Sequence, residues 1–151
     1  MSDRTNLQCY IYACPDDQKQ AAADALSEMQ LNWGCADATP RELVLNQPYT
    51  EDQARCGSAE ELAAELREAA PGASFVLWED PAYEWLGSLQ AYTPELGEFA
   101  GECDADGQVV AVLAGILAEI DKVAGDAAAI RAALHRAMGG PWFDDWSSKR
   151  S

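Results

Sequence analysis

Apolar residues change their spacing along this chain, from the two-residue period of a strand to the 3.6-residue period of a helix and back. Residues 7–14 alternate in part and are rich in β-formers, so they predict a strand with Leu7 and Ile11 on one face. Residues 22–29 carry an apolar stripe at helical spacing, in a helix that Pro15 opens. A chain that switches period in this way must pack strands and helices against each other.

The middle of the chain continues the same order. Residues 41–46 predict a short second strand, and residues 58–61 match a capping box, in which a serine and a glutamate satisfy each other's free backbone amides at a helix start. Strands are predicted at 73–78 and 86–92, and we interpret 97–103 as the return arm of a hairpin. These signals add a strand, a helix and then at least two further strands to the strand and helix already predicted.

The strongest helical period of the chain runs from Val109 to Ile120, and Gly125 ends that helix. Asp126 can cap one more helix, which ends at Gly139. The predicted order is therefore β-α-β-α-β-β-α-α, followed by an aromatic and acidic tail over residues 141–151.

This order predicts an α+β fold, in which helices cover one face of a mostly antiparallel sheet and a C-terminal helical hairpin is added. A ferredoxin-like core is one concrete version of it. Nothing repeats at a solenoid period and no linker divides the 151 residues, so we predict a single domain over 1–151.

Charge is the outstanding bulk property, with 26 acidic against 10 basic residues and a formal net charge of −16. Such a charge keeps a protein soluble, and it repels nucleic acid and anionic membranes, so we expect neither as a direct partner. Residues 1–6 have no apolar signal region, and no apolar run approaches the roughly 18 residues of a membrane span. A cytoplasmic location is the expectation.

Motifs for catalysis or cofactor binding are not found. The sequence has no phosphate-binding glycine motif and no Cys-x-x-Cys pair among its five cysteines, so we predict no cofactor, no metal site and no catalytic residue. We interpret the only histidine, His135, as a partly exposed side chain near a helix C-terminus, where its positive form is favourable. A site assembled from residues distant in sequence stays open as an alternative.

Residues 102–109 resemble the first half of a calcium loop, with oxygen ligands at alternate positions and Gly107 at the sharp turn. Leu113 stands where the bidentate glutamate of such a loop belongs. The other interpretation is a tight Asp-Gly turn whose acids cap the following helix. A calcium-stabilised module is therefore a further alternative.

The segment between Arg67 and Lys122 contains no lysine, arginine or histidine. Its acids have no local partners in sequence, so we predict an uncompensated negative surface on which aromatic residues serve as anchors. Trp78 is expected in the core. The predicted partner-binding residues are Glu79, Asp80, Glu84, Trp85, Glu95, Glu98, Glu102, Asp104, Asp106, Asp144, Asp145 and Trp146.

These features favour a non-enzymatic, acidic module that binds the basic surface of another protein. Its sharpest form is a nucleic-acid mimic that inhibits a DNA- or RNA-binding protein, because regularly spaced carboxylates imitate the phosphates of DNA. The alternatives are a small enzyme or ligand-binding domain and the calcium-stabilised module. The sequence does not predict an oligomeric state.

Overall fold

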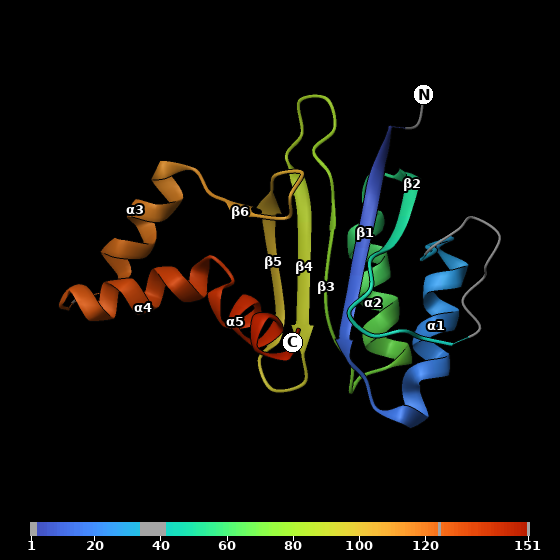
Figure 1. Cartoon of the computed structure of the whole chain (residues 1–151). Helices are drawn as coiled ribbons and strands as arrows, with labels where there is room; N and C mark the ends of the chain where they lie inside the picture. Colours follow the sequence, from blue (N-terminus) through green and yellow to red (C-terminus); the bar gives the residue numbers. More distant parts are fainter. Residues whose placement is uncertain (1–2, 34–41, 124, 151) are drawn as a thin grey trace.

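The structure is a computed structural model that describes residues 3–33, 42–123 and 125–150. Within these residues, six antiparallel strands form one sheet in the order β2-β1-β3-β4-β5-β6 (Figure 1). The strands are β1 (Arg4–Ala13), β2 (Tyr49–Arg55), β3 (Ser74–Glu79), β4 (Gly87–Thr93), β5 (Gly97–Cys103) and β6 (Val109–Val110). The helices are α1 (Lys19–Glu28), which follows the short 3-10 turn η1 (Asp16–Gln18), α2 (Ser58–Ala69), α3 (Leu113–Lys122), α4 (Ala127–Ala137) and α5 (Gly140–Lys149).

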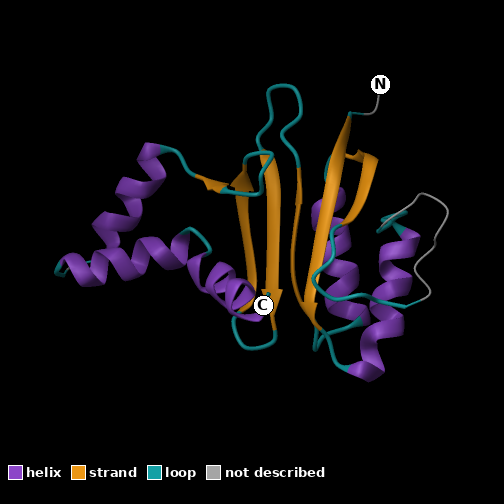
Figure 2. Ribbon diagram, viewed as in Figure 1, coloured by secondary structure: helices purple, strands orange, loops and turns teal. Residues whose placement is uncertain are grey.

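Both faces of the central strands are buried, because helices pack on both sides of the sheet (Figure 2). On one side α1 and α2 cover Leu7, Ile11 and Leu77. On the other side α5 contributes Trp142 and Trp146 to a second cluster. The rest of that cluster consists of Tyr12, Val76, Trp78, Leu89, Ala91 and Cys103. β3 is buried along its whole length, as expected for a strand between two layers.

The predicted α+β class, the antiparallel sheet and the C-terminal helical hairpin are confirmed. A ferredoxin-like core is not confirmed, since that fold has the order βαββαβ and this chain begins β-α-β-α-β-β. The prediction that helices cover one face did not anticipate α5. The tail predicted at 141–151 lies largely within this helix, which packs on the second face of the sheet.

The second strand lies at β2 and not at residues 42–46, which form no strand; Arg41 lies outside the described residues. Asn46 adopts a positive φ of 62°, and the Val44 amide donates to the Tyr49 hydroxyl at 2.9 Å, so this segment turns before the strand starts. Leu43 still packs into the core from this irregular segment. The apolar residues indicated burial correctly, but not extended pairing.

The predicted capping box does not form at the start of α2. Gly57 is the N-cap residue, and no side chain at that position caps the helix. The carboxylate of Glu79 accepts hydrogen bonds from the backbone amides of Gly57 at 3.0 Å and Ala59 at 3.2 Å, while Glu61 pairs with Arg55. A glutamate from the adjacent strand therefore satisfies the free amides of the helix.

Burial shifts the ionisation of side chains in the second cluster. It raises the pKa of the Cys103 thiol to about 12, and it raises the pKa of Tyr12, whose hydroxyl also donates to Asp145 on α5 at 2.9 Å. Both groups are favoured in their neutral form, so their contribution to stability is complete below their unfolded pKa values and is lost as the pH rises toward the folded ones.

We therefore expect the free energy of unfolding to fall between about pH 9 and about pH 12. Urea denaturation at a series of alkaline pH values measures this. Cys103→Ala removes one of the two groups and should make the decline shallower. A stability that does not change over this range would contradict the assignment.

Candidate functional site

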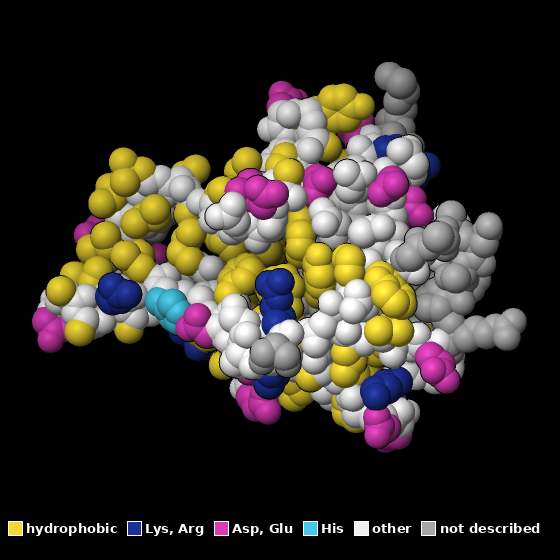
Figure 3. Space-filling model, viewed as in Figure 1, with side chains coloured by type: hydrophobic (Ala, Val, Ile, Leu, Met, Phe, Trp, Pro, Cys, Tyr) yellow, Lys and Arg dark blue, Asp and Glu magenta, His cyan; other side chains and the backbone are white. Residues whose placement is uncertain are grey.

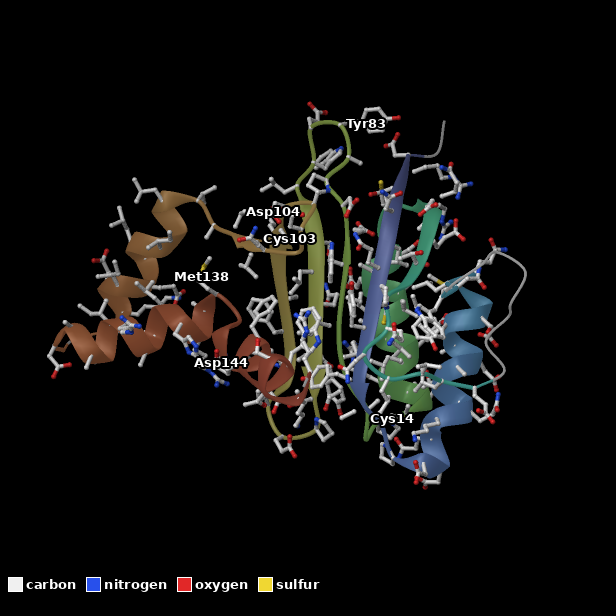
Figure 4. The ribbon with its side chains drawn as sticks, in the orientation of Figure 1. Cys14, Tyr83, Cys103, Asp104, Met138 and Asp144 are labelled. Atoms are coloured by element: carbon white, nitrogen blue, oxygen red, sulfur yellow. The ribbon has the colours of Figure 1, made fainter. Side chains whose placement is uncertain are left out.

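The predicted partner-binding residues do not gather on a single face. Asp80, Glu84 and Trp85 lie at the upper end of the sheet as drawn in Figure 1, where β3 finishes and Gly87 of β4 pairs with Cys103 of β5. Glu102, Asp104 and Asp106 follow at the same end, and Figure 4 shows Asp104 below the loop that carries Tyr83. Glu95 and Glu98 lie at the opposite end, in and after the β4–β5 turn. Asp144, Asp145 and Trp146 lie on α5.

Several of these acids are engaged within the fold. Glu79 is buried at the N-terminus of α2, and Asp80 accepts hydrogen bonds from Asn6 and Gln8, both at 3.0 Å. The remaining pairs are Glu98 with Arg67 at 3.0 Å, Asp144 with His135 at 2.9 Å, and Asp145 with Tyr12 and Lys149. Of the predicted acids that the structure describes, Glu84, Glu95, Glu102 and Asp106 are exposed, and their carboxylates form no ion pair or hydrogen bond within the described residues.

A loop at the upper end of the sheet exposes three large apolar side chains. We call residues 80–86, which connect β3 to β4, the aromatic loop. Tyr83, Trp85 and Leu86 are 84%, 67% and 51% exposed. Neighbouring exposed aromatic and aliphatic side chains of this kind often mark a binding site.

The aromatic loop is held by a tight backbone turn. The amide of Ala82 donates to the carbonyl of Trp85 at 3.1 Å, and the amide of Trp85 donates to the carbonyl of Ala82 at 3.0 Å. Tyr83 adopts a positive φ of 55°, which is uncommon for a bulky residue. Strain of this kind persists where the surrounding structure fixes it, and it occurs often at functional sites.

The other tryptophans near acidic residues are structural. Trp78 is in the core, as predicted: it stacks on Tyr10 with ring centroids 5.7 Å apart. Trp142 and Trp146 are buried against the sheet, and the Trp142 indole donates to the carbonyl of Gly97 at 2.9 Å. Of the predicted aromatic anchors, Trp85 is thus the one that reaches solvent.

Residues 104–108 form the predicted Asp-Gly turn, but its acids do not cap a helix, because β6 follows the turn and α3 begins at Leu113 without a side-chain cap. Oδ1 of Asp104 accepts hydrogen bonds from the backbone amides of Asp106 at 3.0 Å and Gln108 at 2.9 Å. Gly107 has a φ of 72° and lies against the Trp78 ring. Within the described ranges, no group of three or more His, Cys, Asp or Glu side chains is placed to hold a metal ion.

A second exposed feature was not anticipated from the sequence. In the part of the chain that the structure describes, neither α3 nor α4 has a buried residue, and hydrophobic side chains gather over both helices at the left of Figure 3. We call these two helices the helical arm. Along α4, one open face of the helix is apolar and consists of Ala127, Ile130, Leu134 and Met138, with Arg131 and His135 also at its surface.

His135 belongs to this arm and is roughly half exposed. Its Nε2 lies 2.9 Å from Oδ2 of Asp144, and Gly140 packs directly against its ring, so the pair joins α4 to α5. We therefore interpret His135 as a structural residue that connects the helical arm to α5.

Comparison with known proteins identifies one family. The model of the family described as protein of unknown function (DUF3145) matches residues 10–151. The chain belongs to this family. No curated protein and no solved structure matches the chain. The match includes the aromatic loop, the helical arm and α5, so all three fall within the family's domain.

None of the described helices combines the length and the apolar character needed to cross a membrane.

Proposed function

We propose that this chain is a non-enzymatic, acidic module that binds the basic surface of another protein through its aromatic loop. The observation that carries the proposal is the exposure of Tyr83 and Trp85 on a turn of fixed geometry. In the proposed role the module acts in the cytoplasm.

The aromatic loop has the composition of an interaction hot spot. A few aromatic side chains supply most of the binding energy at protein interfaces, and polar residues surround them. Here Glu84 lies between the two aromatic residues, and Glu102 and Asp106 lie at the same end of the sheet. These three exposed carboxylates would form an acidic rim that favours lysine and arginine on the partner.

The rest of the molecule supports the same kind of partner. A net charge of −16 attracts basic proteins from a distance and speeds their association. The backbone pair between Ala82 and Trp85 already orders the loop, so binding would cost little additional conformational entropy.

Replacing Trp85 by alanine should weaken partner binding by a factor of about ten to one hundred, which is the usual range for an aromatic hot-spot residue. The full chain is immobilised, partners are captured from a lysate of the source organism, and the captured protein is titrated against each variant. Trp33→Ala is the matched control, because Trp33 is 39% exposed and lies on a different segment.

A second pair of variants tests the acidic rim. Glu84→Gln should weaken binding a few-fold at low salt and have little effect at high salt, where charges are screened. Glu95→Gln makes the same change at the opposite end of the sheet and should leave binding unchanged. Equal affinities for the Trp85→Ala and Trp33→Ala proteins would refute the proposal.

Nucleic-acid mimicry is the narrower form of this proposal and stays a prediction. Several of the predicted carboxylates are occupied by partners within the fold and the others lie at two ends of the sheet, so the geometry gives more support to the general form. The narrower form requires that the captured partner binds nucleic acid. It also requires that duplex DNA competes with this chain for the partner.

A further inference from the structure

The helical arm projects from the sheet with apolar side chains uncovered. On and beside α3, the side chains of Val112, Leu113 and Leu117 are 66%, 69% and 50% exposed. A helix of a folded domain normally buries its apolar stripe against a neighbour. Two adjacent helices with uncovered apolar stripes are equivalent to half of a four-helix bundle.

Each helix of the arm has its own exposed apolar face. Leu113 and Leu117 are four residues apart, so they form one exposed ridge along α3. Ile130, Leu134 and Met138 form a second apolar face along α4. Because both faces lie on the same arm, two copies related by a two-fold axis could each pack the α3 face against the partner's α4 face.

Charge also favours the arm as the place where two copies meet. Residues 109–139 contain three acidic and three basic residues, so this segment has no net formal charge in a chain of −16. Outside this segment the chain has 23 acidic and 7 basic residues, so like charges oppose most other contacts between two copies. Within α3, Glu119 pairs with Lys122 at 2.6 Å. The exposed Asp121 is also on α3 and the exposed Arg131 is on α4, so an α3-to-α4 pairing between copies places these opposite charges near each other.

We propose that two copies of this chain associate through their helical arms, each α3 against the partner's α4, and form a symmetric dimer with a four-helix bundle at its centre. This proposal goes beyond the proposed function and does not depend on it. The aromatic loop lies at the upper end of the sheet, away from the arm in Figure 1, so the dimer would present two loops. A partner with two basic sites would then bind with avidity.

Sedimentation equilibrium of the full chain over a range of micromolar concentrations tests this. The wild-type protein should approach twice the monomer mass of 16.3 kDa. Leu117→Glu should raise the dissociation constant of the dimer at least tenfold, because it places a charge in an apolar interface. The matched control is Leu86→Glu, the same substitution at a leucine of nearly equal exposure, 51%, in the aromatic loop. Leu86→Glu should leave the dimer intact. The conservative variant Leu117→Met should dimerise like the wild-type protein.

The dependence on salt separates this proposal from the proposed function. Added salt screens the repulsion between two acidic chains, so the dimer should become tighter, whereas partner binding at the aromatic loop should weaken. A wild-type protein that remains monomeric at every concentration, or equal dissociation constants for Leu117→Glu and Leu86→Glu, would overturn the dimer. A monomer that captures a different protein through Leu117 would overturn it as well. Unchanged partner binding by Trp85→Ala would instead refute the function and leave the dimer standing.

Discussion

Replacing Glu79 by glutamine is expected to lower the free energy of unfolding by about 2–3 kcal/mol. The reason is that this buried carboxylate accepts hydrogen bonds from the free backbone amides at the start of α2. Glutamine keeps one oxygen but turns an NH₂ group toward amides that are themselves donors. It also removes a negative charge from the N-terminal end of the helix dipole. Urea denaturation followed by circular dichroism measures the change.

Glu102→Gln is the matched control for this prediction. Glu102 is exposed on β5, and loss of a surface charge without a partner should change stability by no more than about 0.5 kcal/mol. If the two glutamine variants are equally stable, the hydrogen bonds of Glu79 do not hold α2 on the sheet.

Replacing Gly107 by alanine is expected to destabilise the protein by roughly 3 kcal/mol, from two separate costs. Gly107 adopts a φ of 72°, which an alanine reaches with strain, and a Cβ there would lie 2.8 Å from two carbons of the Trp78 ring. The ring cannot easily move, since it is buried and stacked on Tyr10. The fluorescence of the variant should also shift, because a displaced Trp78 gains access to water.

Gly97→Ala isolates the first of these costs. Gly97 has a similar φ of 76°, but nothing lies within 4 Å of the position that its Cβ would take. We expect this variant to lose only about 1 kcal/mol. A Gly107→Ala protein that is no less stable than Gly97→Ala would contradict the close contact with Trp78.

The fold class could be predicted because local sequence patterns indicate most of the helices and strands. β1, β3 and β4 have β-forming apolar residues, and the residues that end α2 and begin α4 are recognisable. β2 could not be predicted in this way, since it is an edge strand whose central residues are polar. β2 is a strand because it pairs with β1, which is distant in the sequence. The local sequence of β2 does not indicate this pairing.

The candidate site could be predicted only in part, for a related reason. Trp85 and Glu84 were named from the sequence and lie on the exposed loop, whereas Glu79, Asp145 and Trp146 are engaged inside the fold. Whether an acid is free depends on residues far away in the sequence, such as Tyr12 for Asp145.

The helical arm shows the same limit. The helical period of residues 109–120 correctly indicated an apolar face, but its first two residues pair with β5 as β6, and the face is not covered by the sheet. Periodicity identifies which side of a helix is apolar. It does not identify what packs against that side.

Hydrogen exchange of the full chain, with and without the partner captured by the wild-type protein, tests the proposed binding surface most directly. The proposal predicts that bound partner slows exchange of the amides in residues 80–86, with smaller protection at Glu102 and Asp106 and none at Glu95. Protection that is confined to the opposite end of the sheet, with residues 80–86 exchanging as fast as in the free protein, would contradict it.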